Sequence, residues 1–290
     1  RPIFRGPAPV RVDPLNTGAS DFIHLCQPDG GKSCGACCGL YNYADSSRAS
    51  LTARLARRTA RYHATVRRPE DLAAFAAWVR ETEDMTKRYE VIHCCEYLGF
   101  LDDDRRRVGC LLHPLQNAGE DRRDVSFYGR ELCDGHFCPS YHFLSRLEKL
   151  ALLYALDDWY LYGLCLTDID LVKEWFRFVS DAVFETPDPE RFRSGPFRDI
   201  ARAYFAFKLD WPFRDDAVNR LGKYYFDGYQ YMIRLIDYDA LGMPRSRFDK
   251  IFLSLTSIFR DAGEVRRAET LIQDTIDAFV RVYARRSEER

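Results

Sequence analysis

Residues 32–39 read KSCGACCG, and three cysteines, Cys34, Cys37 and Cys38, lie within five positions of this stretch. Cys34 and Cys37 have the C-x-x-C spacing with which two thiolates reach one metal ion across a tight turn, and Gly35 permits that turn. Cys38 points in a different direction from Cys37, so it serves another edge of the same site, a second metal, or a hydrogen bond. The stretch therefore predicts a metal-binding knuckle.

The other cysteines favour metal ligation over a disulfide framework. Nine of the ten lie between Cys26 and Cys138, and two pairs are adjacent in the chain. Adjacent cysteines are poorly placed to bridge each other, because the closed ring strains the disulfide. Thiolates in a reducing compartment fit this pattern better, so we expect a cytoplasmic protein. The predicted metal ligands are Cys34, Cys37, Cys38, Cys94, Cys95, Cys110, Cys133 and Cys138.

The number of sites and some ligands stay open at this level. Eight cysteines fill two four-ligand sites, or one site with spare thiols, and spacing does not decide between them. Cys26, His113 and His136 are further possible ligands, and each histidine is alternatively a hydrogen-bond donor to a thiolate or a plain loop residue. Cys165 lies in an apolar stretch with helical periodicity and is predicted to be a small core residue.

The first half of the chain predicts a loop-rich cysteine region that contains a helical hairpin. Residues 1–33 are rich in proline and glycine and predict an extended arm. Good helix formers run from Ser50 to about Arg68, and a second helix begins at Pro69. Together they predict a helical hairpin over about 50–90. Residues 93–138 predict loops, with turns at 102–109 and 117–124, that a bound metal would hold in place.

The second half predicts an all-helical, aromatic-rich region. Six stretches carry apolar residues at helical spacing, and they are 145–166, 168–184, 197–209, 216–236, 246–263 and 264–286. The fold class is therefore mostly α, with a cysteine region over 1–139 and a helical domain over 140–290.

The overall composition excludes some classes of protein. With 43 basic and 44 acidic residues the net charge is −1, which argues against a general polyanion binder. No apolar run approaches the roughly 18 residues of a membrane span. The N-terminal stretch lacks the apolar segment of a signal peptide, in agreement with the expected cytoplasmic location.

The helix predicted at 50–68 is basic, and two interpretations of its charge are open. Its arginines could follow the phosphates of a nucleic acid. The next helix carries acidic residues near its end, so a mutual charge match is the better interpretation, and nucleic-acid binding remains an alternative. The arginines are Arg54, Arg57, Arg58, Arg61, Arg67 and Arg68, and the acids are Glu81, Glu83 and Asp84.

Four short motifs, taken in order, resemble a family of cysteine-cluster proteins with a zinc- or iron-chelating domain and a C-x-x-C-x-x-C-C type signature. They are CGACCG (34–39), CCEYLGFLDDD (94–104), GCLLHP (109–114) and CDGHFC (133–138). The resemblance covers about residues 26–140 and implies a metal site. In the family another cysteine precedes the knuckle by three or four residues, where Gly30 and Gly31 stand here. Cys26 would replace that cysteine through a longer loop.

The resemblance also suggests which metal is bound. Zinc and a [4Fe–4S] cluster both take four cysteines. Flagellin lysine N-methylase is similar in this region and carries an iron–sulfur cluster, so the resemblance implies iron–sulfur, with zinc as the alternative. Basic residues beside the ligands either offset the charge of the centre or are solvated in loops. They are Lys32, Arg105, Arg106, Arg107, Arg122, Arg123 and Arg130.

The expected function is a metal-binding protein whose helical region contacts a protein partner. The alternative is an iron–sulfur-dependent, methyltransferase-like enzyme that modifies a protein substrate, an analogy that rests on the cysteine region alone. An open ligand position at the metal would favour the enzyme, because structural sites are fully ligated. The sequence names neither a substrate nor a catalytic residue.

Overall fold

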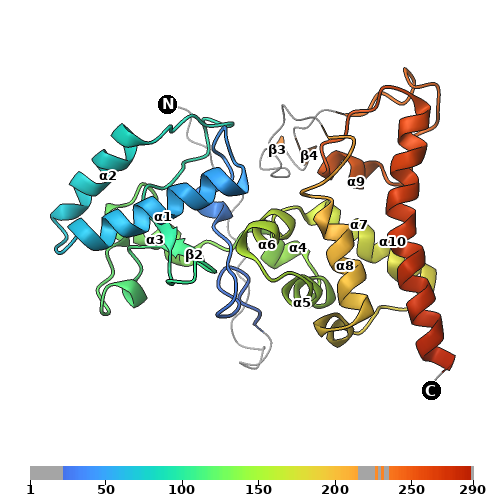
Figure 1. Cartoon of the computed structure of the whole chain (residues 1–290), viewed down its shortest axis with the longest axis horizontal. Coiled ribbons are helices and arrows are strands. Elements are labelled where there is room, and N and C mark those ends of the chain that lie inside the picture. Colours follow the sequence, from blue (N-terminus) through green and yellow to red (C-terminus); the bar gives the residue numbers. More distant parts are fainter. Residues whose placement is uncertain (1–21, 215–225, 228–229, 232–234, 289–290) are drawn as a thin grey trace.

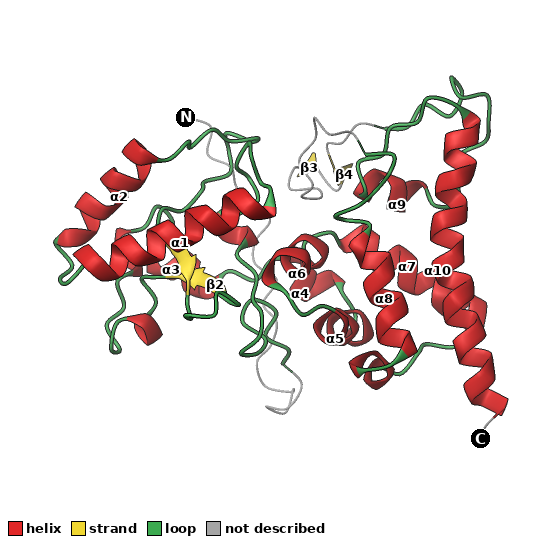
Figure 2. Ribbon diagram, viewed as in Figure 1, coloured by secondary structure: helices red, strands yellow, loops and turns green. Residues whose placement is uncertain are grey.

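The computed structural model describes residues 22–214, 226–227, 230–231 and 235–288, and it confirms the mostly α fold (Figures 1 and 2). The part before residue 139 contains α1 (Arg48–Thr65), α2 (Asp71–Thr82), β1 (Leu98–Phe100), β2 (Val108–Cys110) and α3 (Gly129–Gly135), with the short 3-10 turns η1 (Ala36–Cys38), η2 (Pro114–Gln116) and η3 (Arg123–Val125).

The predicted helical hairpin is present as α1 and α2. The Ser47 hydroxyl accepts a hydrogen bond from the Ser50 amide and begins α1, as a serine N-cap does. The Asp71 carboxylate accepts hydrogen bonds from two backbone amides of the connection, at 2.9 Å each. The rings of Tyr62 and Phe75 meet edge to face with centroids 5.4 Å apart, so the two helices share an apolar contact.

A two-stranded hairpin interrupts the predicted loops at 93–138. Strands β1 and β2 are antiparallel, and Leu98 lies opposite Cys110. The prediction of a turn over 102–109 is therefore wrong for its last two residues. The reason is burial: Val108 is fully buried and its backbone needs a paired partner. A Cβ at Gly99 would lie 2.6 Å from Thr59 Oγ1, so β1 lies directly against α1.

The described residues after Cys138 are mainly helical (Figure 1). Its helices are α4 (Pro139–Phe143), α5 (Arg146–Ala155), α6 (Trp159–Leu166), α7 (Ile169–Val183), α8 (Pro196–Ala206), α9 (Asp249–Ser254) and α10 (Ala262–Glu288), with the 3-10 turn η4 (Pro189–Arg193). Helix α10 contacts α7 and α8, and the indole of Trp175 stacks on Tyr204 in the core between them, with centroids 5.0 Å apart. None of the described helices combines the length and apolar character that a membrane crossing needs.

Two of the predicted helices are each divided in the structure. The stretch 145–166 breaks before Asp158, whose carboxylate accepts hydrogen bonds from two amides at the start of α6. The stretch 246–263 stops being helical after Ser254, and Thr256 adopts a positive φ of 55°. At the first break the Asp158 cap overrides an apolar periodicity that continues across it. After the second, the Ser257 hydroxyl donates to the Phe252 carbonyl at 2.8 Å and satisfies an acceptor at the end of α9.

The helix predicted at 216–236 falls largely outside the described residues. Its described part contradicts the prediction, because β3 (Phe226–Asp227) and β4 (Gln230–Tyr231) pair as antiparallel strands. Asp227 and Gln230 lie opposite each other, so the backbone here is extended and pairs with a neighbouring strand instead of with its own helical turn.

Contacts cross the predicted boundary at residue 139. The Tyr41 hydroxyl donates a hydrogen bond to the Trp159 carbonyl, 3.1 Å away, and reaches the Tyr160 carbonyl at 3.2 Å. These residues belong to one apolar cluster that also contains Leu40 and Val108. The division at residue 139 stays a prediction, and helix α6 contributes to the core on both sides of it.

We predict that Gly163→Ala destabilises the protein. A Cβ at this position in α6 would lie 2.1 Å from the Tyr41 hydroxyl oxygen, which is buried. Overpacking of this kind costs about 1–3 kcal/mol, more than the roughly 1 kcal/mol that alanine gains over glycine in a helix. Thermal denaturation measures the change. Gly135→Ala is the matched control, because no atom lies within 4 Å of its added Cβ. Equal stability of both variants would contradict the prediction.

Candidate metal centre

The knuckle folds as the short turn η1 and packs against the segment that carries Cys94 and Cys95, which we call the second cysteine pair. Gly39 ends the turn with a φ of 77°, a conformation that glycine adopts without strain. A Cβ at Gly39 would lie 2.1 Å from the His93 carbonyl oxygen, so only glycine allows this approach. The Cys95 amide donates a hydrogen bond to the Cys38 carbonyl at 3.0 Å. The knuckle and the second cysteine pair are therefore joined through their backbones.

Four cysteines form what we call the first thiol group: Cys26, Cys34, Cys37 and Cys138. The Cys34 amide donates a hydrogen bond to the Cys26 carbonyl at 2.9 Å. Burial raises the pKa of Cys26 to about 12, and the neighbouring Cys37 and Cys138 raise it as well. Burial also raises the pKa of Cys34, followed by the effects of Cys26, Cys37 and Cys138. Cys26 and Cys34 thus each have Cys37 and Cys138 near enough to raise their pKa.

Tyr141 ties the two ends of the first thiol group together. Its hydroxyl accepts hydrogen bonds from the amides of Leu25 and Cys26, at 2.8 and 3.2 Å, and donates to the Cys26 sulfur at 3.6 Å. Its own amide donates to the Cys138 carbonyl at 2.9 Å. Sequence reasoning missed this residue. Its place one helical turn after Cys138, behind the helix-starting Pro139, was the available signal.

The remaining four neighbouring cysteines form the second thiol group: Cys38, Cys95, Cys110 and Cys133. The first three pack in one apolar cluster with Leu111. Burial raises the pKa of Cys95 to about 12, and Cys110 raises it further. Burial likewise raises the pKa of Cys110 to about 11, and Cys133 adds to the increase.

Cys133 is the exposed member of the second thiol group and lies on α3. Its sulfur is 3.8 Å from the Ser126 hydroxyl. The neighbouring Phe127 ring stacks on His93 with centroids 4.3 Å apart, which holds this loop beside the second cysteine pair.

The two thiol groups meet at the adjacent residues Cys37 and Cys38. A hydrogen bond between their side chains is the largest influence on the pKa of each of these two thiols. It lowers the pKa of Cys37 and raises that of Cys38. Burial then raises the pKa of Cys38 further, as do Cys37, Cys95 and Cys110. Cys37 and Cys38 therefore have each other as main partners, and Cys38 also lies near Cys95 and Cys110; the different direction expected for Cys38 stays a prediction.

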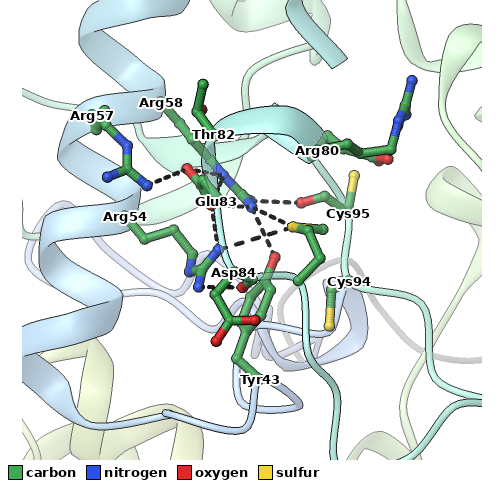
Figure 3. Close-up of polar contacts among 12 residues, drawn as sticks. Tyr43, Arg54, Arg57, Arg58, Arg80, Thr82, Glu83, Asp84, Cys94 and Cys95 are labelled. Carbon is green, nitrogen blue, oxygen red and sulfur yellow. Dashed lines mark hydrogen bonds and ion pairs between the residues drawn. The ribbon is translucent and has the colours of Figure 1, made fainter. Parts of the chain in front are cut away.

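Two cysteines belong to neither group. The Cys94 sulfur is buried and donates to the Gly39 carbonyl at 3.4 Å. Figure 3 shows its sulfur pointing opposite to that of Cys95. Cys165 lies in the core of the helical region, 3.8 Å from the Phe205 carbonyl, which confirms its predicted core position. Cys26, a possible ligand in the sequence, thus has other thiols near it, whereas the Cys94 sulfur contacts a backbone carbonyl; the ligation of both stays a prediction.

The candidate histidines lie close to cysteines in the chain, and the His113 amide donates a hydrogen bond to the Cys110 carbonyl at 3.2 Å. The His113 Nδ1 accepts a hydrogen bond from the Leu115 amide and caps η2. Burial lowers the pKa of His113, and Arg123 lowers it further. His136 is exposed, on the loop between α3 and α4. Their ligation stays a prediction.

Most of the basic residues beside the thiols pair with nearby carboxylates. The pairs are Lys32–Asp29 at 2.7 Å, Arg107–Asp102 at 3.1 Å, Arg122–Glu120 at 2.6 Å, Arg123–Asp121 at 2.7 Å and Arg130–Asp124 at 3.6 Å. Arg123 also opposes the increase in the pKa of Cys110, which is caused first by burial. One guanidinium is therefore close enough to offset negative charge at the second thiol group.

The side chains as they stand are not arranged around an ion. Across the part of the chain that the structure describes, no three or more Cys, His, Asp or Glu side chains lie close enough together to hold one metal. All the cysteines are free thiols, so disulfides do not occupy the donors. Each thiol group contains as many sulfurs as a four-thiolate site needs, and these sulfurs would have to converge to bind a metal.

A buried carboxylate among three arginines supports the second thiol group (Figure 3). Glu83 accepts hydrogen bonds from Arg58 at 2.8 Å, pairs with Arg57 at 3.1 Å, and contacts Arg54. Arg58 also donates to the Cys95 carbonyl at 2.9 Å. The predicted charge match between the basic helix and the acids that follow it is therefore confirmed, and Glu83 is the acid that makes it.

Comparison with known protein families, with curated proteins and with solved structures finds no match to this chain. The resemblance to cysteine-cluster proteins stays a prediction that rests on the motifs alone.

We predict that Glu83→Gln destabilises the fold by about 3–5 kcal/mol at neutral pH, because it leaves buried guanidinium groups without their counter-charge. Burial alone would raise the pKa of Glu83, but its arginines hold it below the usual value. The stabilisation is therefore complete above about pH 4.5 and is lost as the pH falls through the lowered pKa. Urea unfolding at several pH values measures the difference from wild type, which should shrink on acidification.

Glu81→Gln is the matched control for this measurement. Glu81 lies two residues earlier and is exposed, so its substitution should change stability by less than about 0.5 kcal/mol. The same loss in both variants would show that the buried position of Glu83 is not what matters.

Proposed function

We propose that this chain is a metal-binding protein that holds two centres, one in each thiol group. The observation that carries the proposal is the grouping itself. Eight of the ten cysteines form two sets of four, and each set draws its members from chain segments that are far apart in the sequence. In the first set, hydrogen bonds join Cys26 to Cys34 and, through Tyr141, to Cys138, and in the second set Cys38, Cys95 and Cys110 pack in one cluster. Four thiols are the donor set of a structural zinc site and of a [4Fe–4S] cluster.

Iron–sulfur is the proposed cofactor, with zinc as the alternative. The motif resemblance favours iron–sulfur, and the thiol donors fit either centre. When bound, an iron–sulfur cluster would supply electron transfer or a structural cross-link. Cys37 and Cys38 would connect the centres through one peptide bond, and the loop from Cys133 to Cys138 would connect them a second time.

The arginines of α1 favour this function over nucleic-acid binding. Arg54 and Arg58 are buried and bound to Glu83, and Arg61 lies over the ring of Trp78, 5.3 Å from its centroid. These side chains fill structural roles within the fold. The enzyme alternative, in which a cluster serves the modification of a protein substrate, has no specific contact in its favour.

We expect anaerobically purified protein to contain two metal centres per chain, and variants of the two groups to separate them. Cys34→Ser should remove the centre of the first thiol group, and Cys95→Ser that of the second, because each loses one of four ligands. Each single variant should therefore retain about half of the metal, and the double variant almost none. Iron, sulfide and zinc analysis measures the content.

Cys94→Ser and Cys165→Ser are the matched controls, and both should keep the full metal content. Cys26→Ser should lose as much metal as Cys34→Ser. If Cys94→Ser loses metal and Cys26→Ser does not, the grouping is wrong. Brown protein that bleaches with dithionite identifies iron–sulfur, colourless protein loaded with zinc identifies the alternative, and protein without either metal overturns the proposal.

A further inference from the structure

A pocket of about 460 Å³ opens beside the first thiol group, between residues 22–23 and the segment from Phe137 to Lys149. Its walls are aromatic. The ring of Phe22 stacks on Tyr141 with centroids 5.9 Å apart, and Phe137 meets Tyr141 edge to face at 4.9 Å. This volume is in the range of pockets that bind small molecules.

The aromatic walls are unusually open to solvent. Phe22 is 62 % exposed and Phe137 is 47 % exposed, although both rings contact Tyr141. Large apolar side chains gathered in the open around a hollow mark a binding surface more often than a structural core. Aromatic rings in offset or edge-to-face contact also accept a further planar ring at little entropic cost. The walls therefore suit a planar apolar group.

The polar lining of the pocket carries basic groups and no acid. His142, Arg146 and Lys149 lie on α4 and α5 and face the pocket. The Lys149 ammonium donates to the Tyr141 carbonyl at 2.7 Å, which fixes its position at the edge of the aromatic wall. An ammonium has three donors, so this hydrogen bond leaves donors for a ligand. Arg146 lies near Glu190 and shares its charge with that carboxylate. Lys149 is therefore the main candidate to meet an anion.

We propose that this pocket binds a small molecule with a planar apolar body and one anionic group, either a carboxylate or a phosphate. The body lies against Phe22 and Phe137, and the anion meets Lys149 with His142 beside it. Charge-assisted hydrogen bonds of this kind are among the stronger polar contacts of a binding site.

Tyr141 connects the pocket to the first thiol group. Its ring forms the wall, and its hydroxyl donates to the Cys26 sulfur at 3.6 Å. A ligand in the pocket thus lies one side chain away from a thiol. That this thiol holds a metal rests on the proposed function, whereas binding in the pocket does not.

Fluorine NMR titration of the purified protein tests the proposal with three fluorinated probes and one competitor. We expect saturable binding of 4-fluorophenyl phosphate or 4-fluorobenzoate, and the tighter of the two identifies the anion. The cation 4-fluorobenzylamine should bind at least tenfold more weakly, because the lining is basic. Inorganic phosphate, which lacks the apolar body, should compete only weakly. Equal binding of the anionic and cationic probes, or no saturable binding of any probe, would overturn the proposal.

Variants assign the binding to this pocket. Lys149→Gln should weaken the anionic probe about tenfold, the effect of losing one hydrogen bond to a charged group. Phe137→Ala should also weaken it, and Arg281→Gln, which removes an exposed cation of α10, should not. Unchanged affinity in Lys149→Gln would place the binding elsewhere. Circular dichroism of each variant checks that it is folded.

Tyr141→Phe separates this proposal from the metal proposal. It keeps the ring that forms the wall and removes the hydroxyl that contacts Cys26. Probe affinity should stay within about threefold of wild type, since no hydrogen bond from this hydroxyl to the ligand is proposed. Metal content or the visible spectrum of the first centre should change. Probe binding by protein without metal would support the pocket and refute the metal centres, and metal without probe binding would do the reverse.

Discussion

The close approach of the knuckle to the second cysteine pair is the constraint on which the rest of the cysteine region depends. Gly39 has no side chain, and the His93 carbonyl occupies the space that a Cβ would take. The hydrogen bond from the Cys95 amide to the Cys38 carbonyl follows from this contact. Strand β2 adds Cys110, because Leu98 in β1 pairs with it only a few residues after Cys95. Three members of the second thiol group are thus placed by backbone geometry.

The polar core around Glu83 serves the same placement from the other side. Burying a carboxylate is unfavourable unless it is paired, and three arginines of one helix supply the pairing. Arg58 then uses a remaining donor on the Cys95 carbonyl. Helix α1 is therefore coupled to the cysteine pair through a charged network rather than through apolar contact alone. A basic helix that suggests a phosphate-binding surface in the sequence is, in the fold, a structural support.

The start of the helical region is as important to the candidate site as the knuckle. Tyr141 contacts Cys26 at its hydroxyl and Cys138 at its amide, so it closes the first thiol group between segments more than a hundred residues apart. The same ring forms a wall of the pocket. Together with the contact of Tyr41 to α6, this explains why cysteine and helical regions meet along a shared surface: the thiols need residues from both to be assembled.

The sequence by itself determined the mostly α fold, the hairpin over α1 and α2 and the core position of Cys165. Each of these follows from local chemistry, namely helical periodicity, capping residues and the apolar stretch around Cys165. Only the tertiary structure decided which cysteines are neighbours. Cys94 and Cys95 are equivalent in spacing, yet one sulfur turns to the Gly39 carbonyl and the other to Cys110. Cys26 joins the first thiol group because Tyr141 and Cys34 hold its backbone. Such neighbours are set by contacts between distant segments, and no local spacing encodes them.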